Sequence, residues 1–219
     1  YYYVASESDV NYDGGKYWSY AENGTINVWD TAKCSDLSFR LNADGRSYTV
    51  YGMGEYTETD IIIPERYNGL PVKEIGWYAF FGNKTVKNVV IPNSVNSIGR
   101  FAFYGCNELE SVVIPASVKT IGSNAFYDCI SLESVKLADG VKTIGELAFF
   151  NCSSLKKLSI PESVEEIGEQ ALANCTALKH NEKDGLKYLG NETNKYLYLV
   201  GTSSTNITSV NIDINCEFI

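Results

Sequence analysis

The chain has 219 residues, enough for one large domain or two small ones with a substantial core. Its 44% hydrophobic and 21% charged residues are ordinary for a globular protein, and no apolar run reaches the ~18 residues of a membrane span. Lys and Arg number 18 against 27 Asp and Glu, which gives a formal net charge of −9. No basic run is present to neutralise phosphates, so we expect no nucleic-acid partner. Since no long apolar run is present, we also expect no membrane span.

The first residues, Tyr1-Tyr2-Tyr3-Val4, contain no initiating Met and no charged or apolar part of a signal peptide. We interpret them as a processed or truncated start from which any export signal has already been removed.

The next segment, Asp9-Val10-Asn11-Tyr12-Asp13-Gly14, resembles the opening of a calcium loop. The carboxylate that such a loop needs at its twelfth position is replaced by Tyr20, so we favour an ordinary Asp/Gly turn. The sequence therefore predicts no metal and no cofactor, with a calcium site at Asp9, Asn11 and Asp13 as the alternative.

Residues 1–57 predict an N-terminal β-rich cap. Tyr17–Tyr20 and Thr25–Trp29 indicate one hairpin, and the alternation from Leu37 to Leu41 and from Tyr48 to Val50, around the turn Asn42–Gly45, indicates a second. We expect this part to cover the open end of the repeat array that follows, because terminal turns of such arrays need a cap.

Residues 58–177 contain a repeat with a period of 23 residues. Four kinds of residue keep this period: an Ile-Gly pair, an Ala-Phe pair, cysteine and proline. They stand at Ile75-Gly76, Ile98-Gly99, Ile121-Gly122, Ile144-Gly145 and Ile167-Gly168; at Ala79-Phe80, Ala102-Phe103, Ala125-Phe126 and Ala148-Phe149; at Cys106, Cys129, Cys152 and Cys175; and at Pro92, Pro115 and Pro161.

Each repeat predicts the same series of short elements. Leu109, Val112 and Ile114 have the spacing of a strand that Pro115 ends. A second short extended piece leads to Gly122, which we expect to supply a tight bend, and a helical or 3₁₀ turn follows. A single turn buries too little apolar surface to fold alone, so the turns must stack.

The residues from Leu109 to Cys129 resemble the BspA-like leucine-rich repeats of bacterial surface proteins throughout their pattern L-x-x-V-x-I-P-x-S-V-x-x-I-G-x-x-A-F-x-x-C. The chain departs from this pattern at Val86, Ala138, Asn83 and Leu172. We therefore predict an α/β fold, a right-handed leucine-rich-repeat solenoid of five turns that is β-rich, with short helical or 3₁₀ turns and an N-terminal β-hairpin cap.

The first turn carries an insertion, because Pro64 to Val72 spans eight residues where Pro92 to Val95 spans three. We expect the extra residues, Glu65–Gly69, to form a surface loop whose Asn68-Gly69 pair suits a turn with positive φ.

After Leu178 the register breaks. Residues 178–206 predict a degenerate turn with an inserted β-hairpin, formed by Leu186–Leu189 and Tyr196–Val200. Residues 207–219 restart the period at Ile207, and Cys216 and Ile219 fall at repeat positions, so we interpret them as a truncated repeat of a longer protein.

The cysteine ladder does not have the spacing of a zinc site or of a small disulfide framework. Stacked strands lie close enough for disulfides, but equivalent side chains point in parallel, so we predict buried structural thiols. Cys34 lies outside the ladder, and its state stays open.

Outward positions of the stacked strands predict a ligand-binding concave face. Its residues are Asn88, Val90, Ser111, Val113, Ser134, Lys136, Lys157 and Ser159. The face changes from neutral to basic along an acidic molecule, which would orient an anionic or polar partner. A solvated face without a ligand is the alternative, because the face has no Trp, Tyr or Arg.

A second row, formed by Phe81, Tyr104, Tyr127 and Phe150, also repeats at 23. We favour packing of these rings against the neighbouring turn, but exposure would make them a protein-binding or glycan-binding surface.

Catalysis has little support, because His180 is the only histidine and no nucleophile or carboxylate pair accompanies it. The family resemblance implies an extracellular or cell-surface, non-enzymatic, adhesin-like module that binds a protein or glycan on a host or neighbouring cell. The alternative is a structural spacer that presents another domain.

Overall fold

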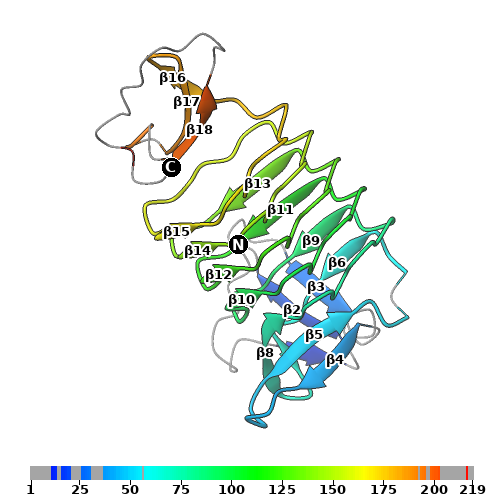
Figure 1. Cartoon of the computed structure of the whole chain (residues 1–219). Coiled ribbons are helices and arrows are strands. Elements are labelled where there is room, and N and C mark those ends of the chain that lie inside the picture. The colour runs from blue at the N-terminus through cyan, green and yellow to red at the C-terminus, as the bar shows by residue number, and fades with distance from the viewer. Residues whose placement is uncertain are drawn as a thin grey trace.

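The computed structural model describes residues 11–13, 16–20, 26–30, 37–55, 57–191, 193–195, 198–202 and 216, with the backbone alone for residues 11–30 and 201–202. Successive turns of the chain stack into a solenoid, which confirms the predicted fold (Figure 1). Two parallel sheets run along the stack, and most turns give one short strand to each.

The first sheet has four parallel strands, in the order β13-β11-β9-β6. Its register joins residues 23 positions apart, as in the pair Ser111 and Ser134, but Asp60 pairs with Asn88, 28 positions later. The predicted insertion accounts for the difference. The bounds are β6 (Asp60–Ile62), β9 (Asn88–Val90), β11 (Ser111–Ile114) and β13 (Ser134–Leu137).

The second sheet runs in the order β15-β14-β12-β10-β8 and continues into β5 and β4. Strand β5 pairs parallel with β8, and β4 pairs antiparallel with β5, so the hairpin predicted around Asn42–Gly45 is confirmed. The bounds are β4 (Ser38–Leu41), β5 (Tyr48–Gly52), β8 (Leu70–Ile75), β10 (Ser97–Ile98), β12 (Thr120–Ile121), β14 (Thr143–Ile144) and β15 (Glu166–Ile167).

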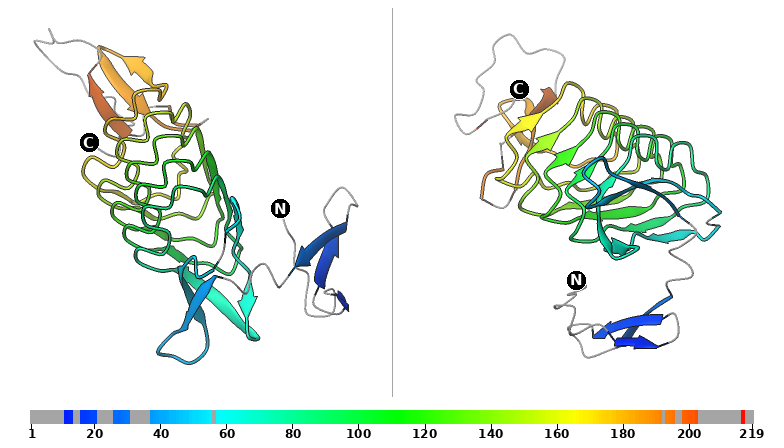
Figure 2. Two further views of the ribbon diagram at one scale, coloured as in Figure 1. Left: turned by 90° about the vertical axis from the view of Figure 1, so that its right-hand side faces the viewer. Right: turned by 90° about the horizontal axis from the view of Figure 1, so that it is seen from below.

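Two small antiparallel sheets flank these, and both contain a predicted hairpin. The first consists of β1 (Asn11–Asp13), β2 (Lys16–Tyr20) and β3 (Ile26–Asp30). The second consists of β16 (Asn181–Lys183), β17 (Leu186–Leu189) and β18 (Tyr198–Thr202), and it lies at the end of the stack opposite β4 and β5 (Figure 2). The sequence did not predict β16.

The insertion in the first turn forms β7 (Arg66–Tyr67), which pairs antiparallel with the start of β8. Asn68 and Gly69 have φ of 48° and 77°, as the turn requires. Arg66, Asn68 and Gly69 are exposed, as expected of a surface loop, while the ring of Tyr67 stacks on Phe39 with centroids 4.1 Å apart. The insertion therefore fastens the hairpin β4-β5 to the first turn.

The core consists of columns of like residues. The rings of Phe80, Phe103, Phe126 and Phe149 are buried and stack in parallel, with centroids 5.0–5.1 Å apart. This distance is close to the ~4.8 Å between neighbouring strands, so each ring contacts its equivalents in the adjacent turns.

Between the two sheets, each turn closes with hydrogen bonds from residue i+3 to residue i. Ala125 N–H donates to the Gly122 carbonyl (3.2 Å), and Cys129 N–H donates to the Phe126 carbonyl (3.3 Å). The amide of Phe126 donates instead to the Ala148 carbonyl of the next turn (2.7 Å). Because such amides bond along the solenoid axis, they cannot form helical i→i−4 bonds. The described residues therefore contain no helix, and the solenoid takes an all-β form.

The thiols of the cysteine ladder are free and buried, as predicted. Each also donates a hydrogen bond to a carbonyl of the preceding turn; Cys106 Sγ, for example, lies 3.1 Å from the Phe80 carbonyl oxygen. Burial raises the pKa of Cys106 to about 12 and that of Cys129 and Cys152 well above the usual range. These thiols are therefore neutral packing groups.

Candidate functional site

The outward side chains of the first sheet form one face, which we call the ladder face. It contains the predicted residues Asn88, Val90, Ser111, Val113, Ser134, Lys136, Lys157 and Ser159. The sequence missed two members in the first turn, Asp60 and Ile62, which pair with Asn88 and Val90. Side chains along a strand point inward and outward in turn, so the inward Ile61 and Ile63 could have identified both as outward residues.

Exposure on the ladder face follows the pleat of the strands. Val113 is 55% exposed, whereas its neighbours Val112 and Ile114 are 2% and 0% exposed. Val90 and Ser111 are half-buried, and the other six predicted residues are exposed. The structure thus brings all eight predicted residues onto or beside one sheet.

Polar side chains at the start of the ladder face bond to one another. Asn88 Nδ2 donates to Asp60 Oδ1 (2.8 Å), and Ser111 Oγ donates to Asn88 Oδ1 (3.1 Å). These contacts fix the side chains of three successive turns, so the face is preorganised at this end.

Residues of opposite charge form pairs in the row beside the ladder face. Lys87 pairs with Glu110 (3.5 Å), and Lys156 pairs with Glu133 (2.7 Å). All four side chains are about half exposed, so each pair stabilises the fold by no more than ~1 kcal/mol. The face itself carries Lys136 and Lys157, which give it positive charge on an acidic chain.

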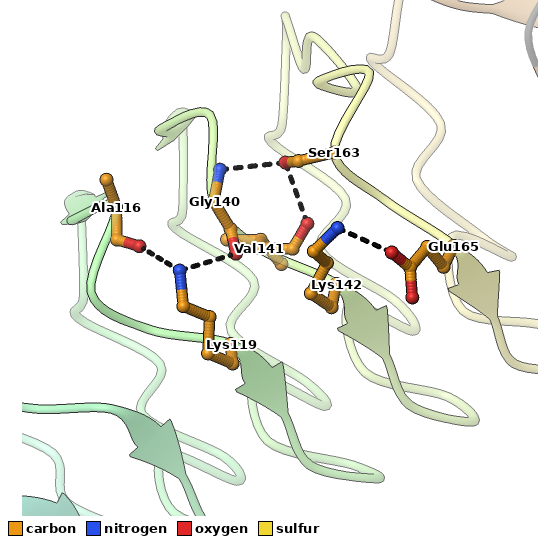
Figure 3. A network of polar contacts seen from close by, with 7 residues as sticks. All are labelled: Ala116, Lys119, Gly140, Val141, Lys142, Ser163 and Glu165. Atoms are coloured by element: carbon orange, nitrogen blue, oxygen red, sulfur yellow. Dashed lines mark hydrogen bonds and ion pairs between the residues drawn. The ribbon is translucent and has the colours of Figure 1, made fainter.

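A polar network joins three turns where the repeat departs from its Pro-x-Ser-Val pattern (Figure 3). The amide of Gly140 donates to Ser163 Oγ (2.7 Å), and this hydroxyl donates to the Val141 carbonyl (2.9 Å). Lys119 Nζ donates to the carbonyls of Ala116 (2.9 Å) and Gly140 (3.3 Å).

The same network includes an ion pair between Lys142 and Glu165 (Figure 3). Since its donors and acceptors satisfy one another, we interpret it as a clamp between turns. It lies beside the turn in which Ala138 stands at the position that proline occupies in other repeats.

Aromatic side chains form a second exposed surface. Phe81, Tyr104, Tyr127 and Phe150 stack face to face with centroids 4.8–4.9 Å apart, as the predicted packing between turns requires. Phe81 is nevertheless 51% exposed, and the others are half-buried. The column therefore packs and also contributes to the surface.

The sequence missed the residues that widen this surface, namely Trp77, Tyr78, Arg100 and Phe101. None of them repeats at 23 along the whole array, so periodicity could not reveal them. A local signal was available in Trp77-Tyr78, because consecutive large aromatics beside a core Ala-Phe pair cannot all face inward.

A shallow depression of about 490 Å³ lies beside β4 and β5. Asn42, Ser47, Thr49 and Glu74 bond to one another there, as in the contact of Thr49 Oγ1 with Asn42 Oδ1 (2.7 Å). These contacts support the hairpin, and we assign no ligand to the depression.

The remaining candidates from the sequence are the calcium site, Cys34 and His180. Asp9 and the side chains of Asn11 and Asp13 lie outside the described residues, as does Cys34. No group of three or more His, Cys, Asp or Glu side chains in the described part could hold a metal ion. His180 is half-buried, and desolvation with the nearby Lys187 lowers its pKa.

The described residues also include no helix of the length and hydrophobicity that a membrane span needs. The predicted restart of the repeat at residues 207–219 lies outside the described residues except for Cys216.

Known proteins match both the sequence and the fold. The sequence pattern of the BspA type leucine rich repeat region matches residues 72–199 in six copies, which is more than half of the chain. It extends beyond the five turns predicted from the ladders and includes the inserted hairpin. Comparison with curated proteins found no match.

Among solved structures, the leucine-rich repeat protein of T. pallidum is 30% identical, with a TM-score of 0.64 over 66% of this chain and 67% of its own. A leucine-rich repeat protein from Bacteroides ovatus is 34% identical, with a TM-score of 0.60, and the match covers 66% of this chain and 39% of that protein. The pneumococcal vaccine antigen PcpA is 20% identical over 94% of this chain and 59% of its own, with a TM-score of 0.55, and shares the fold.

Proposed function

Because the chain belongs to the family of BspA-type leucine-rich repeat proteins, we propose that it is a non-enzymatic binding module that acts outside the cell or at its surface. Its partner is a protein or glycan of a host or neighbouring cell, bound on the ladder face. The shared fold of a pneumococcal vaccine antigen supports this location.

One observation carries the proposal: the ladder face is an exposed row of side chains on an in-register parallel sheet. Such a scaffold holds its outward residues in fixed positions, so binding costs little conformational entropy. Val113 supplies exposed apolar area at the centre, and Lys136 and Lys157 supply charge at one end.

The experiment compares binding of the wild type and of Lys136→Glu/Lys157→Glu to an array of glycans and extracellular-matrix proteins. We expect the double substitution to abolish the binding of at least one probe. Arg40→Glu/Arg46→Glu is the matched control, because it makes the same change of charge at exposed positions of the hairpin β4-β5 and should leave binding unchanged.

A structural spacer is the second candidate function. The contacts among Asp60, Asn88 and Ser111 favour it, since these side chains already satisfy one another. If no probe on the array binds the wild type, the spacer is the better description and the binding proposal is wrong.

A further inference from the structure

Four aromatic rings at the start of the solenoid form one continuous patch, which we call the aromatic corner. Tyr78 stacks on Phe101 (4.9 Å between centroids) and Phe81 stacks on Tyr104 (4.9 Å). The two stacks also contact each other, through Tyr78 and Phe81 (5.5 Å) and through Phe101 and Tyr104 (5.9 Å).

Trp77 and Arg100 border the corner. Trp77 is 68% exposed, and its Cδ1 atom lies close to Gly99 in the next turn. The guanidinium carbon of Arg100 lies 5.9 Å from the centre of the Phe101 ring. Tyr78 is 53% exposed, so the largest exposed side chains of the described solenoid gather here.

The backbone under the corner has a left-handed conformation that recurs at the equivalent position of the following turns. Tyr78 and Phe101 have φ of 61° and 58°, a region that bulky residues rarely adopt. The equivalent residues of the next three turns, Asn124, Leu147 and Gln170, have φ of 58°, 55° and 53°. The conformation therefore belongs to the repeat, and the first two turns differ from the later ones in carrying aromatic residues at this position.

The chemistry of the corner selects its partner. Stacking covers both faces of the Tyr104 ring, with Phe81 on one side and Tyr127 on the other. The Tyr104 ring therefore offers its edge to solvent, and ring edges are the positive part of the aromatic quadrupole. Together with Arg100, such edges attract carboxylates and the faces of other aromatic rings.

Charge along this side of the solenoid favours one orientation of a charged partner. The row that begins with Trp77 and Arg100 continues through Ser123 to Glu146 and Glu169, which are exposed. An acidic partner is attracted by Arg100 in the second turn and repelled by Glu146 and Glu169 in the last two. Trp, Tyr and Arg are also the residue types that dominate the energetics of protein interfaces.

We propose that the aromatic corner, together with the bordering Trp77 and Arg100, docks an acidic segment of another protein that carries aromatic side chains. This site is separate from the ladder face and does not depend on the function proposed for it.

The test titrates the full chain with three synthetic peptides of equal length by isothermal titration calorimetry. The first alternates Asp or Glu with Tyr or Phe, the second has Asn and Gln in place of the acids, and the third has Leu in place of the aromatics. We expect the first peptide to bind, and both Trp77→Ala and Arg100→Glu to weaken it about tenfold or more.

Two variants control for general effects. Leu41→Ala removes an apolar side chain that is exposed to a similar degree, and Arg46→Glu makes the same charge change as Arg100→Glu. Both lie on the hairpin β4-β5 and should bind the first peptide as the wild type does. Circular dichroism and thermal unfolding establish that every variant is folded.

Other occupants give different results, and each would overturn the proposal. If the second peptide binds as well as the first, charge plays no part. If a β-linked oligosaccharide binds and Trp77→Ala abolishes this binding, the corner is a glycan site. Self-association in sedimentation that Trp77→Ala abolishes means a second copy of the chain. If acrylamide quenches the tryptophan fluorescence of the wild type and of Trp77→Phe to the same extent, other residues of the chain cover Trp77. Absence of binding by the first peptide also refutes the proposal.

Discussion

The glycine of each Ile-Gly pair is required by space rather than by backbone conformation. In Gly145 the φ angle is not positive, but an added Cβ would lie 2.5 Å from the amide nitrogen of Ser123 in the preceding turn. That is too close for any carbon, so the two turns would have to separate. The tight bend expected from the sequence is thus better described as close contact between backbones.

Gly145→Ala should therefore destabilise the fold by about 1–3 kcal/mol, because overpacking forces the backbone of two turns apart. Gly76→Ala is the matched variant, since its Cβ would meet its nearest neighbour at 3.0 Å, and we expect a smaller loss. Urea unfolding measures both free energies. Equal losses at the two positions would contradict the explanation from backbone contact.

Buried thiols should make stability depend on alkaline pH. Cys106 keeps its proton up to a pKa of about 12 in the folded chain, whereas an unfolded cysteine loses it near ~8.5. Its contribution to stability is complete below the unfolded pKa and is lost as pH rises toward the folded pKa.

Urea unfolding at pH ~8 and ~10 should show this fall, and the fall should be smaller in Cys106→Ala, which lacks the titrating group. The variant also serves as the control for tyrosine and lysine residues that titrate in the same range. An identical fall in both proteins would refute the role of the thiol.

At the scale of one turn, the solenoid is made of interchangeable units. Each turn bonds to the one before it through the same backbone contacts, such as Gly122 N–H to Ile98 carbonyl and Gly145 N–H to Ile121 carbonyl, both 2.8 Å. A unit removed in full leaves its two neighbours with matching surfaces.

Deletion of residues 107–129 should therefore give a folded solenoid with lower stability. It removes one complete turn and joins Cys106 to Ile130, so that Cys106 takes the place of the equivalent Cys129. Deletion of residues 107–118 is the control, since it removes a fraction of a turn and brings polar residues to core positions. Circular dichroism and urea unfolding compare the two proteins. A shorter protein that is unfolded after the complete deletion would rule out interchangeable turns.

The inward residues made these units predictable, and the outward residues did not. Ile121 and Phe126 repeat because every turn imposes the same core on them, so their period predicts the stacking and the burial. Trp77 and Tyr78 face solvent, where no packing constraint imposes a repeat. Strand β16 escaped prediction for a similar reason, because Asn181–Lys183 has no apolar alternation and is ordered by pairing with β17.

At the scale of the molecule, one apolar core extends from Leu37 to Leu189, although each turn contacts only its neighbours. Inner turns are supported on two sides and outer ones on one side. Stability against local opening should therefore vary along the solenoid.

Hydrogen exchange should find the slowest amides in β11 and β12, near the middle of the stack, and faster ones in β16–β18. Mass spectrometry of exchanged peptides measures this profile, with the chain in urea as the reference for full exchange. Uniform protection along the array would mean that the solenoid opens only as a whole.

The buried thiol column makes unfolding difficult to reverse under oxidising conditions. The chain has six cysteines, and the four in the column are buried in the folded protein. Unfolding gives them ordinary reactivity, and any disulfide then formed removes the thiol proton that each donates to a carbonyl, as Cys106 does to Phe80.

Refolding from urea should therefore recover nearly all of the native signal with a thiol reductant and progressively less after longer exposure to air without it. Equal recovery in both samples would show that the thiols do not trap the chain. The fold thus keeps its own cysteines from reacting, so the chain must complete its folding before it meets an oxidant.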